Sequence, residues 1–393
     1  MMDFLTDEMR RNPYPLYAQM REGAPLLNVP GTKMWMVFDY ENVKRVMSEH
    51  ELFASRATPP GAAAPPDWLI FMDPPRHTKL RALILKAFTP KAVAALEPRI
   101  RELTKELLDQ HVPRGEMDLV DDFSVQLPAL VIGDMLGIPF EDRPRLKRWN
   151  EAILGLADGV IGTDPKGSAQ RYFAAKEEMT TYVAEMIAAR TTNPRDDLMT
   201  RLVQAEVDGE RLSHSDILGF FMLLIFAGTE TTTNLINNAI VTLLEHPAEL
   251  EKLKANPALT QTAIEEVLRY RSPAQVMFRE TKVELQLHGQ TIPAGTLILP
   301  VIGSANRDPK QFQNPDTFDI TRNPNPHIGF GHGIHFCIGA PLSRLEAKVA
   351  LPALLSRLQN LRLASDEPWE PRKAFNVHGP THLPIRFEPG DRL

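Results

Sequence analysis

Cysteine is almost absent from this sequence: Cys337 is the only one among 393 residues. One cysteine excludes an internal disulfide bond, and it cannot supply the several thiolates of an ordinary iron–sulfur cluster. Any metal that the chain binds through sulfur therefore has a single protein sulfur ligand.

An excess of positive charge is also absent. The formal net charge is −6 and the sequence pI is about 6.0. Nucleic acids and anionic membranes attract proteins that present a broad basic surface, so we expect neither as a partner.

Long apolar runs and targeting signals are missing as well. The longest apolar run without a charge, residues 217–229, is shorter than the roughly 20 residues that cross a bilayer. Residues 1–21 carry charges among their apolar side chains and lack the apolar core and cleavage motif of a signal peptide. We therefore expect a cytoplasmic protein without a membrane anchor, in which residues 217–229 belong to a buried helix.

Helical periodicity is plentiful, and 43% of the residues are hydrophobic, which is enough for a substantial core. The pattern predicts helices at 40–48, 91–110, 124–136, 141–156, 168–190, 213–245, 257–270 and 338–350, and strands at 25–29, 34–38, 276–280, 283–287 and 296–300. Strand segments lie toward both ends of the sequence, with the helices between them. Strands from the two ends must therefore pair with each other. We expect a mainly α single domain, residues 1–393, with small β-sheets.

Cys337 lies in a glycine-rich turn that leads into the helical pattern at 338–350. Gly331, Gly333 and Gly339 allow the backbone to turn tightly and to approach a bulky partner. The free N–H groups at the start of a helix would favour the thiolate. An isolated cysteine is more often an inert buried thiol, but this setting favours a chemical role.

A second unusual stretch, 227–233, interrupts the predicted central helix with glycine, threonine and an acidic residue. These residues have low helix propensity, and a threonine hydroxyl that bonds to a preceding carbonyl can distort a helix. Two interpretations stay open: a polar satellite of the core, or a proton path in which Glu230 and Thr231 serve a reacting centre.

Several charged residues become informative only as a set. Glu266 and Arg269 lie three apart on one helical face, which by default indicates a surface ion pair of small energetic value. His77 and Arg81 lie four apart and could bind an anion together. Arg279 and His335 are further candidate partners of a carboxylate.

Together these motifs resemble the cytochrome P450 superfamily, in its soluble bacterial form, over essentially the whole chain. The stretch 330–339 resembles the haem-binding signature, 227–231 the oxygen-activating helix motif, and Glu266-x-x-Arg269 the family's E-x-x-R pair. The resemblance implies the P450 fold, with haem b between the long central helix and the helix that follows Cys337.

The resemblance also assigns roles to single residues. It makes Cys337 the iron ligand, Gly228, Glu230 and Thr231 the oxygen-activating residues, and Arg322 a third member of the ion pair. The implied haem-binding residues are His77, Arg81, Ala227, Arg279, Phe330, Gly331, His335, Cys337 and Gly339.

The implied activity is insertion of one atom of O2 into a hydrophobic small molecule by hydroxylation or epoxidation. Electrons would come from NAD(P)H through a ferredoxin or flavodoxin and its reductase, because the chain has no flavin motif and no thiols for a cluster. We expect a monomer that presents a basic patch to an acidic redox partner. The candidate patch residues are Lys79, Lys86, Arg344 and Lys348.

Two other functions stay open at the level of the sequence: a peroxygenase that uses hydrogen peroxide, and a non-catalytic haem protein that senses or carries a gas. The pair Glu230 and Thr231 favours O2 chemistry over both.

The resemblance places the substrate pocket in the regions 56–70, 154–167, 222–227, 276–278 and 377–378. Candidate wall residues are Leu69, Met222, Ile225, Val276, Met277 and Val377. These side chains predict an apolar substrate such as a terpenoid, fatty acid, steroid or polyketide. His378 is an ionisable group in these regions, and we expect it to face solvent.

Overall fold

The computed structural model describes residues 6–56, 67–159 and 165–390, with the side chains of 156–159 and 165–166 left out. Residues 57–66 of the predicted pocket region 56–70 and residues 160–164 of the region 154–167 therefore lie outside the described residues. Chain contacts group the protein into two compact units, and each is discontinuous in sequence. The first unit comprises residues 1–57, 104–125 and 231–393; the second comprises 58–103 and 126–230.

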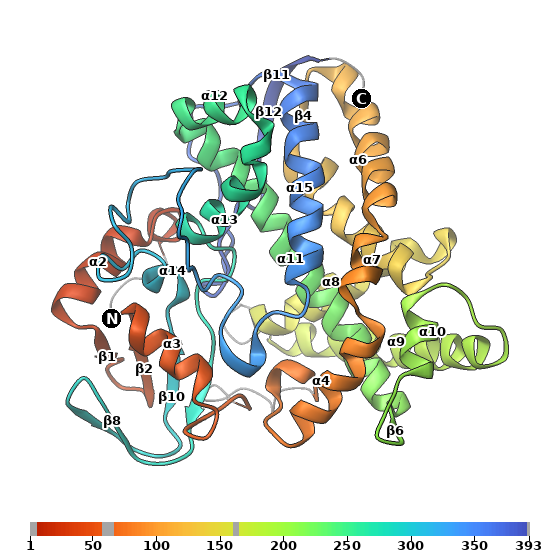
Figure 1. Ribbon diagram of the computed structural model, residues 1–393, viewed down its shortest axis with the longest axis horizontal. Helices are drawn as coiled ribbons and strands as arrows, with labels where there is room; N and C mark the ends of the chain where they lie inside the picture. Colours follow the sequence, from red (N-terminus) through yellow and green to blue (C-terminus); the bar gives the residue numbers. More distant parts are fainter. Residues whose placement is uncertain (1–5, 57–66, 160–164, 391–393) are drawn as a thin grey trace. The chain divides into compact units, whose positions relative to one another are not determined.

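The first unit contains the larger sheet. Its strand order is β1 (Leu26–Asn28), β2 (Met34–Val37), β10 (Leu297–Pro300), β7 (Arg279–Thr281) and β3 (Phe53–Ala54). Strands β2 and β10 pair in parallel and the other pairs are antiparallel. Figure 1 shows β1, β2 and β10 side by side. The predicted pairing of strands from opposite ends of the sequence is thus confirmed.

Apolar side chains bury both sides of this sheet. One cluster includes Val37, Phe53 and Ile298, each no more than 1% exposed, and packs on α3 (Tyr40–Ser48). Another includes Tyr17 and Phe38 and packs on α2 (Tyr14–Gly23). The sheet is therefore a rigid support for the loops that leave its strands.

Further elements of this unit are helices and two small sheets. The helices are α1 (Asp7–Arg11), α12 (Pro247–Ala255), α13 (Thr260–Tyr270), α14 (Ile302–Ala305) and α15 (Ala340–Arg357). One sheet has the order β11 (Leu358–Leu363), β12 (Pro384–Pro389), β4 (Glu116–Asp118), and the other is the hairpin β8 (Leu285–Leu287) and β9 (Gln290–Ile292).

The second unit is almost entirely helical. It contains α4 (Arg76–Ala87), α5 (Pro90–Ala94), α7 (Gln126–Leu136), α8 (Arg143–Gly159), α9 (Pro165–Thr192), α10 (Leu198–Gln204) and the hairpin β5 (Glu206–Val207) and β6 (Glu210–Arg211). Its core is aromatic. Trp149 of α8 packs edge-on against Tyr182 of α9 at 5.3 Å and against Phe221 at 5.9 Å, between ring centroids.

Two helices contribute residues to both units: α6 (Glu97–His111) and α11 (His214–Glu245). A capping box opens α11: the Ser213 and Asp216 backbone N–H groups each donate to the other residue's side chain, both at 3.1 Å. Its length and composition would suffice to cross a membrane, but 61% of its most apolar window is buried in the protein, as in the core helix of a folded domain.

Three predicted helix boundaries were wrong. The helix predicted at 91–110 is divided because Thr89 caps the short α5, which ends at Ala94 before α6 begins. Residues 120–124 form one π-helical turn ahead of α7. The helix predicted from residue 338 begins at Ala340.

The hairpin at 285–292 was predicted only in part. The run at 283–287 gives β8, but β9 was missed. The turn between them places His288 at φ 48° and Gly289 at φ 71°. Two consecutive left-handed residues are typical of a tight hairpin turn, and His-Gly is not among the usual dipeptides.

Candidate functional site

The cysteine turn is fixed by the backbone of its own loop and by α3. Gly331 and Gly333 have φ of 80° and 73°, a region that side chains rarely adopt. A β-carbon on Gly333 would lie 2.7 Å from the Ser48 Cα. The Cys337 N–H donates to the Phe330 carbonyl at 2.9 Å and closes the turn.

Cys337 lies three residues ahead of α15. The Ala340 N–H donates to the Cys337 carbonyl at 3.4 Å, and Pro341 occupies the first turn, where a missing N–H costs little. The sulfur is partly buried, and a β-carbon on Gly339 would lie 3.8 Å from it, in ordinary contact. The positive end of α15 follows the sulfur closely, although the helix does not begin at the cysteine as predicted.

The two candidate anion-binding residues of the first unit, His335 and Arg279, each have a hydrogen-bond partner. The His335 Nε2 lies 2.8 Å from the Ser55 hydroxyl, 280 residues away in sequence. Arg279 on β7 is 3% exposed and donates from Nη1 to the Phe278 carbonyl at 2.8 Å. Both candidate anion-binding residues of this unit are therefore held in place by other groups.

A cluster of ion pairs lies beside the Phe330 ring. The Arg344 guanidinium lies 4.5 Å from the centroid of the Phe330 ring and donates to both carboxylate oxygens of Glu265, at 2.7 and 2.8 Å. His327 lies 2.9 Å from the same carboxylate. Burial alone would raise the pKa of Glu265, but hydrogen bonds and charges of Arg344 and His327 outweigh it and lower the pKa to about 2.

Glu266 and Arg269 form a fully buried ion pair. Both side chains are 0% exposed, and Arg269 donates to the two carboxylate oxygens at 2.8 Å each. Arg322 adds a third charge, with Nε 3.1 Å from Glu266 Oε1. The Asp319 N–H and the Asn325 side-chain amide also donate to this carboxylate. The default interpretation as a surface pair was wrong, since the pair anchors the loop 319–325 to α13.

In the second unit, α4 carries His77 and Arg81 one turn apart. His77 is 1% exposed and Arg81 is partly buried. Helix α11 stays α-helical through the stretch 227–233. A β-carbon on Gly228 would lie 2.7 Å from the Ile132 Cδ1 of α7, so α11 and α7 approach closely at this glycine.

The predicted pocket-wall residues are mostly buried. Leu69, Met222, Ile225 and Val276 are at most 4% exposed, and Met277 and Val377 are partly buried. In the second unit, the ring of Trp68, next to Leu69, lies 5.6 Å from that of Phe226 between centroids. In the first unit, Val377 pairs with Ala274 as an isolated bridge.

His378 does not face solvent, contrary to our expectation. It is 2% exposed, and its Nε2 lies 3.0 Å from the Arg11 carbonyl. Burial lowers the pKa of His378 to about 3, with help from the positive charges of Arg271 and Arg307. The expectation failed because the partner carbonyl lies 367 residues away in sequence.

Carboxylates neutralise part of the charge of the predicted basic patch. Arg344 is committed to Glu265, and Lys79 forms an exposed 2.7 Å ion pair with Glu210. Lys86 and Lys348 are exposed. Two of the four predicted residues therefore present a charge that a carboxylate already neutralises in part.

Sequence reasoning also missed polar residues that support the site. Ser55 at the end of β3, Asn306 and Asn325 were not singled out. Asn306 links two segments: its carbonyl accepts from Arg269, and its Oδ1 accepts from the Ile328 N–H at 2.8 Å. No local pattern distinguishes such residues from ordinary loop residues.

Comparison with known proteins places the chain in a family. The sequence model of the cytochrome P450 family matches residues 16–380. Putative cytochrome P450 YjiB of Bacillus subtilis is 41% identical, over 91% of this chain and 90% of that protein. Cytochrome P450 monooxygenase PikC of Streptomyces venezuelae is 37% identical, over 98% and 94%.

A solved structure agrees over its whole length. The crystal structure of CYP109E1 from Bacillus megaterium in complex with testosterone superposes with a TM-score of 0.88 at 39% identity. The match covers 96% of this chain and 99% of that chain.

The chain therefore belongs to the cytochrome P450 family and has its fold. It is a monooxygenase with the family's thiolate-ligated haem iron, and it acts on a small molecule with O2 and electrons from redox partners. The two alternatives that the sequence left open, a peroxygenase and a gas-binding protein, are not favoured.

Proposed function

We propose that Cys337 is the axial thiolate of a haem b in this monooxygenase. The observation that carries the proposal is the turn itself: the only cysteine of the chain is partly buried, directly precedes a helix, and is flanked by glycines with no side chain to fill the space beside it. A sulfur donor ahead of a helix N-terminus suits an iron that must keep its ligand deprotonated. When bound, the haem supplies the reduction and cleavage of O2.

We further propose that basic side chains neutralise the two haem propionates. In the first unit these are Arg279 and His335, and Ser55 would orient the His335 ring through their 2.8 Å hydrogen bond. In the second unit they are His77 and Arg81. The backbone and side chains proposed to contact the flat porphyrin are those of Ala227, Phe330, Gly331 and Gly339.

Glu230 and Thr231 are proposed to hold and deliver the protons that oxygen cleavage requires. Both lie on α11 and are only partly buried, so water can reach them. Gly228, one turn before Thr231, is proposed to complete the oxygen-activating motif by letting Ile132 of α7 pack closely against α11. In this assignment the threonine hydroxyl orients water, and the carboxylate behind it exchanges protons with solvent.

The proposed substrate is a hydrophobic small molecule that undergoes hydroxylation or epoxidation. The candidate walls Leu69, Met222, Ile225, Val276, Met277 and Val377 are all apolar. The structural relative CYP109E1 was solved with testosterone, which supports a substrate of steroid or comparable size. A screen for compounds that change the haem absorption spectrum of the purified protein would test this class.

We propose that NAD(P)H supplies the electrons through a ferredoxin or flavodoxin and its reductase. We also propose a cytoplasmic monomer in which residues 1–393 form one domain. That α6 and α11 each contribute to both units supports the single domain.

The decisive experiment for the iron ligand is the absorption spectrum of the reduced carbon monoxide complex. A red-shifted Soret band indicates thiolate ligation, and Cys337→His should abolish the shift while retaining haem. An unshifted band in the unaltered protein would reject Cys337 as the ligand.

The proton-delivery proposal has its own test. Thr231→Ala should release peroxide at the expense of product, with little change in NAD(P)H consumption. Thr232→Ala is a matched control, because the Thr232 hydroxyl is committed to the Ser343 side chain at 3.1 Å. Equal peroxide release from both variants would reject the assignment.

A further inference from the structure

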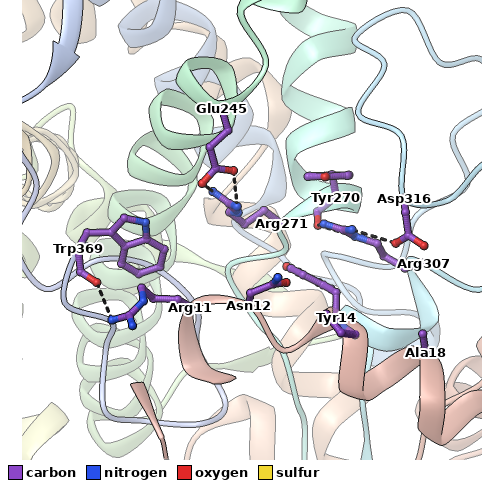
Figure 2. A pocket seen from close by; sticks show the side chains of 11 residues that line it. Arg11, Asn12, Tyr14, Ala18, Glu245, Tyr270, Arg271, Arg307, Asp316 and Trp369 are labelled. Carbon is purple, nitrogen blue, oxygen red and sulfur yellow. Dashed lines mark hydrogen bonds and ion pairs between the residues drawn. The ribbon is translucent and has the colours of Figure 1, made fainter. Parts of the chain in front are cut away.

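A cavity of about 520 Å³ lies in the first unit, between the start of α2, the end of α11 and the end of α13. No residue that we assign to the haem, to oxygen or to the substrate lines it. Figure 2 shows charged and aromatic side chains from distant parts of the sequence around this space. The volume is within the usual range, roughly 300–1,000 Å³, of pockets that hold a small molecule.

Arg307 forms part of one wall of the cavity and has hydrogen-bond partners of its own. The Arg307 guanidinium lies between two aromatic rings, 3.7 Å from the centroid of Tyr14 and 3.5 Å from that of Tyr270. It donates to the Tyr270 carbonyl at 2.8 and 3.0 Å, and to Asp316 at 3.0 Å. This arginine is thus built into the wall and has little capacity left for a ligand.

One buried donor of the cavity has no partner. The Arg271 Nε belongs to a residue only 7% exposed and has no hydrogen-bond partner among the described residues. The Tyr14 hydroxyl, in a residue 5% exposed, has the Gln275 side chain beside it. In Figure 2 the Tyr14 hydroxyl points toward Asn12 and Arg271. A buried donor without a partner destabilises the folded protein, so a ligand that supplies acceptor oxygens would bind favourably there.

Arg11 adds a donor at the edge of the cavity. One of its terminal nitrogens donates to the Trp369 carbonyl at 3.3 Å, a long bond that leaves most of the guanidinium's donors for other partners. The Trp369 side chain lines the same side of the space. A charged donor beside an aromatic surface suits a ligand that joins a carboxylate to a ring.

The balance of charge selects a monoanion. Three arginines line the cavity, Arg11, Arg271 and Arg307, and two carboxylates oppose them, Glu245 and Asp316, which leaves one positive charge. Glu245 neutralises Arg271 through bonds of 2.7 and 3.3 Å, and Asp316 neutralises Arg307. The surplus charge is therefore that of Arg11.

We propose that this cavity is a binding site for a small aromatic monocarboxylate, whose carboxylate contacts Arg11 and the donors of Tyr14 and Arg271 while its ring lies against Trp369. Arg271 lines the cavity and begins the segment 271–276, whose Ala274 pairs with Val377. A bound ligand would therefore stabilise a segment that carries the proposed substrate-wall residue Val276 and pairs with a second one, Val377.

The test is isothermal titration of the purified haem-loaded protein with 2-naphthoate and, separately, with the neutral 2-naphthamide. The acid should bind with one-to-one stoichiometry and at least tenfold more tightly than the amide. Because this comparison uses the unaltered protein, it does not depend on the folding of any variant. Equal affinities, or no saturable binding of the acid, would overturn the proposal.

Variants then locate the site. Arg11→Gln should weaken binding of the acid at least tenfold, and Trp369→Leu at least threefold. Arg10→Gln is the matched control: it removes the same charge from the preceding residue, which pairs with Asp7 at 3.1 Å and does not line the cavity. It should change the affinity less than twofold. A loss that is equal in Arg10→Gln and Arg11→Gln, or binding that survives both Arg11→Gln and Trp369→Leu, would place the ligand elsewhere.

Discussion

Glu266 offers the most direct test of what holds the site's supporting loop. Its carboxylate accepts hydrogen bonds from both Arg269 and Arg322, from the Asp319 N–H and from the Asn325 amide. The substitution Glu266→Gln keeps the volume of the side chain but removes its charge and replaces one acceptor oxygen with a donor amide. At least one guanidinium N–H would then face another N–H group.

The expected loss of folding stability in Glu266→Gln follows from the burial of the ion pair. Removing one partner of a buried ion pair costs about 3–5 kcal/mol, because the remaining charge is left uncompensated. We expect about 3 kcal/mol, at the lower end of this range, because both arginines keep carbonyl acceptors. Arg269 retains those of Asn306, Pro315 and Thr317. For a chain of 393 residues, about 3 kcal/mol corresponds to a decrease in Tm of roughly 4 °C.

Thermal unfolding and hydrogen exchange of the purified protein would measure this. The loop 313–325 should exchange faster in Glu266→Gln, since both of its anchors to α13 are weakened. The matched control is Glu265→Gln, the same chemical change at the next residue, whose side chain is 22% exposed rather than 0%. We expect about 1 kcal/mol there, because solvent screens a partly exposed pair. Equal decreases in Tm for the two variants would refute the argument from burial.

Three further predictions follow from the same structure. Gly333→Ala should weaken haem binding and lower the Tm, because the new β-carbon would lie 2.7 Å from the Ser48 Cα and the residue has a φ of 73°; the ratio of haem to protein after purification checks it. His378 has its pKa lowered from 6.5 to about 3, so the native state excludes a proton that the unfolded state binds below pH 6.5. Stability should therefore fall as the pH drops from 6.5 toward 3, and His378→Gln should flatten this dependence in denaturant titrations; an unchanged slope would contradict it. Lys86→Glu and Lys348→Glu should each slow reduction by an acidic ferredoxin, with an effect that shrinks at high salt, and unchanged stopped-flow kinetics would count against the docking role.

The features that could be predicted from the sequence are those whose partners are close along the chain. The spacing of Glu266 and Arg269 fixes them on one face of α13, and the capping box at Ser213 marks the start of α11. Hydrophobic periodicity identified most helices because each must bury one side. Boundaries were wrong where a local cap or a π turn interrupted the pattern, as at Thr89 and at 120–124.

Contacts between distant segments could not be predicted in this way. His335 and Ser55 are 280 residues apart, and His378 and the Arg11 carbonyl are 367 apart. A serine at a strand end or a histidine in a loop has many possible partners, and only the folded chain selects one. Burial was therefore underestimated most for polar residues, because the sequence shows their cost but not the partner that offsets it.

The contacts of the polar side chains on α11 support the structural interpretation for the residues that follow Thr231. After Thr231 the polar side chains bind structural partners: Thr233 donates to the Ser124 carbonyl at 2.9 Å, and Asn238 donates to the carbonyls of Arg271 and His378, both at 3.0 Å. These residues are 0% exposed, so water does not exchange with them readily. They form a buried polar cluster beside the hydrophobic core, and their hydrogen bonds connect two loops to the helix. Glu230 and Thr231 are only partly buried. The proposed proton path therefore concerns only these two residues, and the low helix propensity of the rest of the stretch is explained by the bonds it makes.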